Sequence, residues 1–192
     1  ESVQGGRVAD SVEKIFEKSG AVLKGHFLLT SGLHSPIYWE KFQVLQFPNY
    51  TEQLCGMIAD RFREQEVQAV AGPTTGGIIL AHEVARQLGV RSIFAEKEES
   101  GERTFRRGFL IAPDERILVV DDILTTGGSI REVIAAVNKR GGKVIGIGVL
   151  VDRSQQKIEF GAPLFRCHRS ETVAYTPEEC PLCAARIPLL KP

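Results

Sequence analysis

The chain has 192 residues, which corresponds to about one domain. Lys and Arg together number 24 and so do Asp and Glu, so no net charge drives binding to nucleic acid or to a membrane surface. No window approaches the ~18 to 20 consecutive apolar residues of a membrane span, and the first residues lack the basic start and apolar stretch of a signal peptide. We therefore expect a soluble, cytoplasmic protein that binds neither nucleic acid nor membranes.

The first part of the chain predicts a small region outside the main sheet. Apolar residues at helical spacing predict a helix from Val8 to near Ser19. Residues 25–40 mix apolar and turn residues, as short strands joined by tight turns do. Helical spacing then returns between Tyr50 and Glu64. We call residues 8–48 the hood.

From residue 67 onward strands and helices alternate, with short connections between them. Such alternation favours an α/β fold whose parallel sheet has helices on both faces. The charged segment 96–108 predicts an exposed mobile loop leading into a short strand over 105–111. We expect one domain over residues 1–192 that ends in an irregular C-terminal extension over 159–192. The expected strands are 67–72, 91–96, 116–122 and 143–152, and the expected helices are 76–89 and 127–142.

The stretch from Arg116 to Ile134 carries the clearest chemical signal. An apolar strand reaches the carboxyl edge of the sheet and is followed by Asp121 and Asp122, then by small and hydroxyl residues over 125–129 and by a helix. Small residues let the backbone curl round an oxyanion, and a helix start offers unpaired N–H groups. Two carboxylates suit hydroxyl donors rather than a second phosphate. The stretch predicts a site for ribose 5-phosphate; the alternative is an ordinary strand, turn and helix.

Residues 119–129, VVDDILTTGGS, resemble the phosphoribosyl pyrophosphate (PRPP) signature of type I phosphoribosyltransferases. Neither GxxxxGK[ST] nor GxGxxG after a strand is present. Segments 25–40, 72–89 and 149–154 are similar, in order and spacing, to segments of orotate phosphoribosyltransferases, so the resemblance covers most of residues 8–155. It implies the type I phosphoribosyltransferase fold and transfer of the ribose 5-phosphate of PRPP to orotate. The products would be orotidine monophosphate and pyrophosphate, in pyrimidine biosynthesis.

The resemblance also implies roles for single residues. Asp121 and Asp122 would hold the ribosyl hydroxyls as catalytic residues. Arg153 would bind the orotate carboxylate, since a guanidinium donates two parallel hydrogen bonds to a carboxylate. Thr125 would lie near the base, and the backbone from Thr125 to Ser129 would hold the 5-phosphate. The implied PRPP-binding residues are Asp121, Asp122, Ile123, Leu124, Thr125, Thr126, Gly127, Gly128, Ser129, Lys97, Thr74, Thr75 and Gly76.

Two further segments complete the implied site. The turn 72–77, GPTTGG, would receive pyrophosphate on its backbone N–H groups, although a helix-entry loop can have the same composition. Lys97 is the best-matched catalytic cation, and Arg103 a weaker one, on a loop that in this family closes over the neighbouring subunit's site; a charge run is also often only a solvated face. A homodimer with shared active sites is therefore implied. Mg²⁺ would bind mainly through PRPP and pyrophosphate, and no residue is assigned as a metal ligand.

Some positions depart from the family pattern. The usual loop histidine is absent, Glu96 stands where arginine is common, the 72–77 turn has no lysine, and Thr30 and His34 replace basic residues. Two other interpretations therefore stay open: a type I transferase for another base, such as a purine, or a non-catalytic regulator that senses PRPP. Regulators of that kind usually add a basic DNA-binding module, for which the chain shows no sequence.

The cysteines and two aromatic residues give weaker signals. Cys180 and Cys183 form one CxxC pair, with Cys167 and His168 about 12 residues upstream. The four could make a zinc site or a redox switch, but a single CxxC without a second knuckle favours plain tail cysteines. Tyr38 and Trp39 are expected to be packing residues rather than a platform on which a base stacks.

Overall fold

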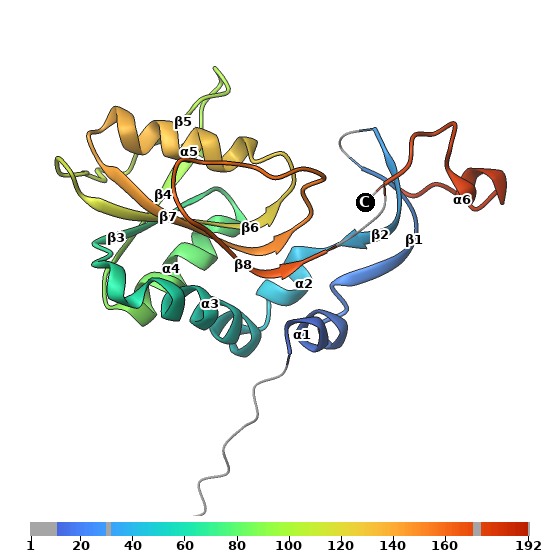
Figure 1. Ribbon diagram of the computed structural model, residues 1–192, viewed down its shortest axis with the longest axis horizontal. Coiled ribbons are helices and arrows are strands. Elements are labelled where there is room, and N and C mark those ends of the chain that lie inside the picture. The colour runs from blue at the N-terminus through green and yellow to red at the C-terminus, as the bar shows by residue number, and fades with distance from the viewer. Residues whose placement is uncertain (1–10, 30–31, 171–173, 192) are drawn as a thin grey trace, which may run out of the picture.

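The computed structural model describes residues 11–29, 32–170 and 174–191. Its centre is a six-stranded sheet in the order β5-β4-β3-β6-β7-β8 (Figure 1). All neighbouring strands are parallel except β5, which is antiparallel to β4. The strands are β3 (Ala69–Pro73), β4 (Arg91–Lys97), β5 (Arg103–Phe105), β6 (Arg116–Leu124), β7 (Lys143–Asp152) and β8 (Leu164–Arg169). The expected α/β fold is confirmed.

Helices cover both faces of this sheet (Figure 1). On one face α3 (Pro48–Phe62) and α4 (Gly76–Leu88) pack against alternate strand residues such as Val70 and Leu118. On the other face α5 (Gly128–Lys139) packs against the residues in between, such as Ile117. The central strands are therefore apolar on both sides, which explains why their sequence reads as continuous apolar runs.

The hood is a separate small sheet. β1 (Val22–Leu28) pairs antiparallel with β2 (His34–Trp39), and α1 (Val12–Lys18) precedes the pair. The rings of Phe16 and Trp39 meet edge to face with centroids 4.9 Å apart, which joins α1 to β2. Val8, where the first helix was expected to begin, lies outside the described residues. The remaining elements are α2 (Lys41–Leu45), the 3₁₀ helix η1 (Arg63–Gln65) and α6 (Pro181–Ala184).

Two local predictions were wrong. The charged segment predicted as an exposed mobile loop contains the antiparallel hairpin of β4 and β5, and oppositely charged side chains pair across it: Glu96 with Arg107, and Glu98 with Arg106. Of the strand expected over 105–111, only Phe105 lies in a strand, as the last residue of β5. The C-terminal extension, expected to be irregular from Glu159, contains β8. This edge strand has half-exposed residues and does not show the apolar run of a central strand.

The strand order places a crevice between β3 and β6. The chain leaves β3 through α4 toward β4 on one side, and leaves β6 through α5 toward β7 on the other. At such a switch point the two following turns diverge at the carboxyl edge, where open α/β sheets bind ligands. The turns at 74–75 and 125–127 both lie there. Within the described residues, no helix is long and apolar enough to cross a membrane.

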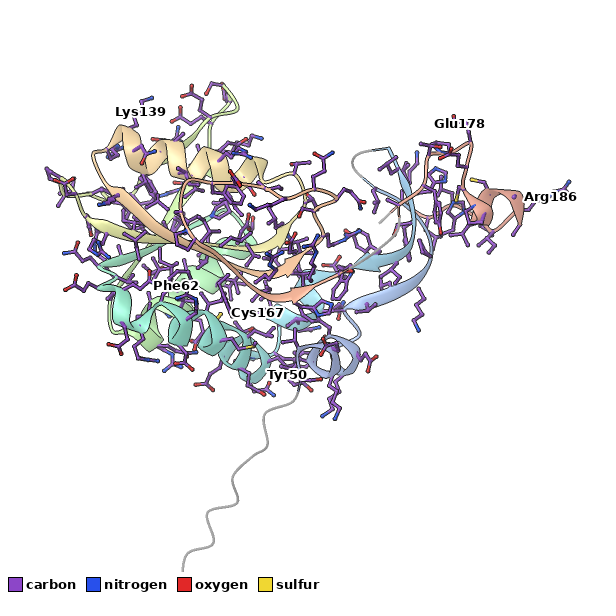
Figure 2. All side chains as sticks on the ribbon, in the orientation of Figure 1. Tyr50, Phe62, Lys139, Cys167, Glu178 and Arg186 are labelled. Atoms are coloured by element: carbon purple, nitrogen blue, oxygen red, sulfur yellow. The ribbon has the colours of Figure 1, made fainter. Side chains whose placement is uncertain are left out.

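Close packing between α3 and β7 holds one face of the sheet together. A Cβ atom added at Gly148 would lie 2.5 Å from Cγ2 of Ile58, and one added at Gly146 would overlap the ring of Phe62 (Figure 2). These two glycines allow α3 to lie directly against the strand backbone. Any side chain there must push the helix away from the sheet.

We expect Gly148→Ala to lower the free energy of unfolding by about 1 to 3 kcal/mol, because the added methyl group overpacks the core. Gly56→Ala in α3 is the matched control: its Cβ would meet only the end of the Gln87 side chain, and alanine favours the helix by up to ~1 kcal/mol. Urea unfolding followed by circular dichroism measures both changes. Equal stability of the two variants would contradict the packing argument.

Candidate functional site

Asp121 and Asp122 lie side by side at the end of β6, and both are buried. Ser129 Oγ donates a hydrogen bond of 2.6 Å to Asp121 Oδ2, and the Asp122 backbone N–H donates one of 2.9 Å to Asp121 Oδ1. Lys41 Nζ lies 2.9 Å from Asp122 Oδ2. The pair is thus held by donors from α5, from its own strand and from the start of α2.

The surroundings of the two acids differ. Burial raises the pKa of Asp121, and the charge of Asp122 raises this pKa further, against the opposing effect of the Ser129 hydrogen bond. Asp122 lines a cavity at the sheet edge, whereas Asp121 does not. Asp122 can therefore accept a hydrogen bond from a hydroxyl group in the cavity. Asp121 instead accepts hydrogen bonds from the Asp122 backbone and from Ser129.

Lys41 was missed by the sequence reasoning. It is the first residue of α2, which follows β2 within the hood, and no local motif marks it. Its ammonium reaches Asp122 only because the hood folds over the carboxyl edge of the sheet. The sequence shows a basic residue directly after the expected strands over 25–40, but it does not show that Asp122 is its partner.

The turn between β6 and α5 requires glycine on two independent grounds. Gly127, the N-cap of α5, has φ of 79°, a conformation that favours glycine, and an added Cβ would lie 2.9 Å from the Phe160 ring. The first N–H groups of α5 have no partner inside the helix, so they can receive an oxyanion. Thr125 and Thr126 line the adjoining cavities, while the Leu124 side chain is buried in the core under α5. Of the segment 123–129, Leu124 can therefore contribute only backbone.

The second glycine turn, 72–77, packs against the acid pair. A Cβ added at Gly76 would overlap Asp122 Oδ2, so the two turns lie next to each other. Arg103 crosses from β5: its Nη1 donates to Thr74 Oγ1 over 3.0 Å, and its Nε lies 3.0 Å from Glu132 Oε2. The turn itself has no cation, and Arg103 of the neighbouring hairpin supplies one. Thr75, an exposed residue, precedes the first turn of α4.

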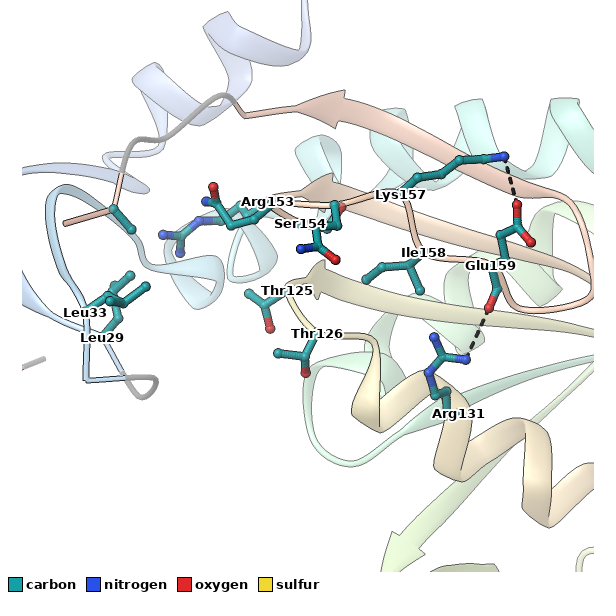
Figure 3. Close-up of a pocket in the computed structure, with 13 residues that line it drawn as sticks. Leu29, Leu33, Thr125, Thr126, Arg131, Arg153, Ser154, Lys157, Ile158 and Glu159 are labelled. Atoms are coloured by element: carbon teal, nitrogen blue, oxygen red, sulfur yellow. Dashed lines mark hydrogen bonds and ion pairs between the residues drawn. The ribbon is translucent and has the colours of Figure 1, made fainter. Parts of the chain in front are cut away.

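Arg153 begins the loop after β7, and its position is determined by its neighbours. Its backbone N–H donates to Leu124 O over 2.8 Å. Asp152 accepts hydrogen bonds from the backbone N–H and the hydroxyl of Ser154, at 2.9 and 2.6 Å, and pairs with Arg166 at 2.6 Å. Figure 3 shows the Arg153 guanidinium reaching from this loop toward the hood.

The guanidinium of Arg153 is incompletely satisfied. Its Nε is buried and has no hydrogen-bond partner among the described residues. Burial lowers the pKa of Arg153. A buried donor without a partner costs about 1 to 3 kcal/mol, and more for a charged group, unless a ligand completes it. The geometry therefore suits a ligand that carries a carboxylate or another planar anion.

Two adjoining cavities meet at Arg153. One, of about 560 Å³, lies between the hood and the sheet edge, and the other, of about 500 Å³, lies under the loop 153–159. Both have a size typical of small-molecule sites. Tyr38 lines the first cavity, whereas Trp39, which also borders it, is mostly buried against Phe16. The residues common to both cavities are Leu29, Thr125, Thr126 and Arg153.

Lys97 lines neither of these two cavities. It is exposed at the end of β4 and has no ion pair within the described part of the chain. Arg103, the weaker candidate, is the cation that contacts the Thr74 turn. Thr30, one of the positions that depart from the family pattern, lies outside the described residues.

Comparison with known proteins agrees with this site. The family described as "Phosphoribosyl transferase domain" matches residues 43–182. The chain is 52% identical over 183 residues to an orotate phosphoribosyltransferase of Pelotomaculum thermopropionicum, covering 95% of this chain and 96% of that protein. It is 50% identical to the enzyme of that name from Caldanaerobacter subterraneus, with the same coverage.

A solved structure shows the same architecture. The orotate phosphoribosyltransferase of Aeropyrum pernix superimposes with a TM-score of 0.70 at 28% identity, over 82% of this chain and 93% of that one. The acid pair beside two glycine turns and the buried Arg153 Nε, which has no partner within the described residues, are consistent with this near full-length similarity. The chain therefore belongs to the phosphoribosyltransferase family and, within it, to the orotate phosphoribosyltransferases.

Proposed function

We propose that this protein is the pyrimidine-biosynthetic enzyme that transfers the ribose 5-phosphate of PRPP to orotate, with release of pyrophosphate. The observation that carries the proposal is the guanidinium of Arg153, whose buried Nε has no hydrogen-bond partner among the described residues and which lines a cavity with Asp122, Thr125 and Thr126. A carboxylate on the base accounts for that guanidinium. A purine has no carboxylate to offer it.

Each part of PRPP has a complementary group in the crevice. The 5-phosphate binds the backbone from Thr125 to Ser129, at the start of α5. Asp122 accepts hydrogen bonds from the ribosyl hydroxyls, and Asp121 holds Asp122 and Ser129 in place. Pyrophosphate binds the turn 74–76, with Arg103 behind it. These assignments place the anomeric carbon between the two turns.

The chemistry needs no protein nucleophile. A ring nitrogen of orotate forms a bond to the anomeric carbon and loses its proton to solvent, while the bond to pyrophosphate breaks and its electron pair leaves with pyrophosphate. Positive charge develops on the ribose ring, where the carboxylate of Asp122 stabilises it. Arg153 and Thr125 orient the base so that its nitrogen faces the anomeric carbon.

The residues present fit a magnesium ion bound mainly through the substrate. The oxygens of Asp121 and Asp122 already accept hydrogen bonds or pair with Lys41, and within the described residues no third His, Cys, Asp or Glu joins them as a metal ligand set. Mg²⁺ keeps several waters and favours phosphate oxygens. When bound, it neutralises charge on the leaving pyrophosphate. Asp122 is the residue placed to reach it through water.

We further propose a homodimer in which Lys97 acts on the partner's substrate. Its exposure, and its absence from the residues that line the two cavities, support this arrangement. The hairpin of β4 and β5 projects from the sheet, as a segment reaching a neighbour must (Figure 1). The cytoplasmic location expected from the sequence stays a prediction.

A panel of bases tests the reaction. With PRPP and Mg²⁺ we expect nucleotide formation from orotate and none from uracil, adenine, guanine or xanthine. Arg153→Met should raise the KM for orotate about tenfold or more, because a charge-assisted hydrogen bond contributes about 1.5 to 3 kcal/mol. Lys157→Met, at an exposed cation that lines one of the same cavities, is the control and should change little. Turnover of a purine in place of orotate would overturn the proposal.

Asp121→Asn should separate stability from activity. Because the folded-state pKa of Asp121 is raised, the folded chain binds its proton more tightly than the unfolded chain, and stability falls as pH rises from about 4 toward 8. Asparagine removes this cost, so its melting temperature should exceed that of the wild type by about 2 to 5 °C at pH 8 and less at pH 4. Turnover should fall at least about tenfold. A melting temperature lowered at pH 8 would contradict the argument.

Mixing two inactive variants tests the shared site. Lys97→Ala and Asp122→Asn should each lose most activity. After exchange of subunits in an equal mixture, half of the dimers contain one chain of each kind, and each of these has one intact site if Lys97 serves the partner. Activity should then recover to about one quarter of the wild-type value. No recovery despite exchange would show that Lys97 does not act across the interface.

A further inference from the structure

The C-terminal segment 174–191 is attached to the hood rather than to the main sheet (Figure 1). Its backbone forms hydrogen bonds with both strands of the hood, β1 and β2. Tyr175 exchanges two hydrogen bonds of 2.8 Å with His34, and Leu190 bridges to β1 by donating to His26 O over 2.7 Å. Glu178 and Arg186 mark its outer end (Figure 2). We call residues 174–191 the tail.

The tail has almost no hydrophobic core of its own. Among residues 174–191 only Cys180 is buried, while Ile187, Leu189 and Leu190 are exposed. A segment that buries so little apolar surface cannot offset the entropy of its own ordering. Small modules of this kind need a covalent or metal link to keep one conformation.

A cluster of four metal-ligating side chains lies where the tail meets the hood. His26 and His34 come from β1 and β2, and Cys180 and Cys183 come from the tail, at the start of and within α6. Their ligand atoms all lie within 4.8 Å of one another. His26 is 1% exposed and His34 is 5% exposed, whereas Cys183 lies at the surface. The cluster is separate from the crevice that holds Asp122 and Arg153.

Three sulfur-to-nitrogen distances inside the cluster match those of a tetrahedral site. Cys180 Sγ lies 3.5 Å and Cys183 Sγ 3.7 Å from His26 Nε2, and Cys183 Sγ lies 3.3 Å from His34 Nδ1. With metal bonds of about 2.0 to 2.1 Å to nitrogen and 2.3 Å to sulfur, neighbouring ligands of tetrahedral zinc are about 3.3 to 3.8 Å apart. The two ring nitrogens, at 2.9 Å, need to separate by only about half an ångström.

The protonation of His26 is also that of a metal ligand. Its Nδ1 lies 2.7 Å from the carbonyl oxygen of Ile187, and because a carbonyl oxygen only accepts, Nδ1 carries the proton. Nε2 then has a free lone pair, and it is the atom that faces His34 and both cysteines. Histidines that bind metals are commonly oriented by such a bond from the other ring nitrogen to a backbone carbonyl.

We propose that His26, His34, Cys180 and Cys183 bind one structural zinc ion that fastens the tail to the hood. Binding releases the two thiol protons to solvent, so one Zn²⁺, two thiolates and two neutral imidazoles give a site without net charge. Neutrality matters because the site is partly buried. All four positions of a tetrahedral ion are occupied, as in structural rather than catalytic zinc sites.

The less favoured alternative from the sequence, a site shared by Cys180 and Cys183 with Cys167 and His168, does not form in the structure. Cys167 Sγ lies 3.5 Å from the Leu54 carbonyl oxygen, against the core under the sheet. His168 Nδ1 lies 3.1 Å from Oε1 of Glu13, a residue of α1. Both residues belong to β8, so the main sheet keeps them away from the tail.

The zinc site would also determine the shape of the substrate cavity. Leu28 and Leu29, two and three residues after His26, line the cavity beside Asp122. Zinc joins β1 and β2 at the end of the hairpin near these residues. The proposal concerns folding and does not depend on which base the enzyme uses.

The untagged full-length protein, purified without chelators, should contain about one zinc per chain by inductively coupled plasma mass spectrometry. After zinc is removed and Co²⁺ is added, the visible spectrum should show the intense bands of tetrahedral cobalt bound to thiolate. Removal of zinc should also speed proteolysis of the tail about tenfold or more. Wild-type protein without zinc and without a cobalt spectrum would sink the proposal.

Cys183→Ser is the decisive variant, because the residue is exposed and its replacement should leave the fold intact by circular dichroism. We expect less than about 0.1 zinc per chain. Cys167→Ser, the same chemical change outside the cluster, should keep about one. Full zinc in Cys183→Ser, or loss of zinc in Cys167→Ser, contradicts the assignment. Two thiols missing from a titration of the unfolded wild type, with no zinc found, indicate a disulfide of Cys180 with Cys183 instead and overturn it.

Discussion

Two carboxylates held side by side in a protein interior repel each other, and much of this fold supports that arrangement at Asp121 and Asp122. Ser129 at the start of α5 and Lys41 at the start of α2 both reach the pair. Gly76 lets the second turn approach Asp122 where any side chain would collide. The start of α5 and the start of α2 each supply a donor to the pair, and the glycine at the start of α4 leaves room for Asp122.

The support is unequal, and the inequality separates the roles of the two acids. Asp121, desolvated and bonded to Ser129, couples the strand end to the phosphate-binding turn, while Asp122 faces the cavity. Arg153 is the opposite case: its loop is braced by Asp152 and Arg166, yet its buried Nε has no hydrogen-bond partner among the described residues. Unfavourable charge on one side of the cavity and an unsatisfied donor on the other are both relieved by a ligand rich in hydroxyls and carrying a carboxylate.

The hood lies over the carboxyl edge of the sheet and is a structure of modest size. It has only two strands, and α1 and the tail pack against them, the first through Phe16 and Trp39, the second through the cluster around His26. A cavity wall made of so few residues depends on such braces for a fixed shape. The zinc proposal and the cavity are linked in this way even though the ligand residues touch no part of the crevice.

The features that could be predicted from the sequence are local ones. The alternation of apolar runs with helical spacing indicated the sheet and its helices, and VVDDILTTGGS contains its acids, its turn and its helix start within eleven consecutive residues. The bonds that complete the site join distant residues: Arg103 with Thr74, 29 positions apart, and Cys180 with His26, 154 apart. Periodicity describes which face of an element is buried but not which elements meet. Tertiary packing alone therefore decided that Lys41 contacts Asp122, that Arg103 contacts Thr74, and that the tail cysteines face two histidines of the hood.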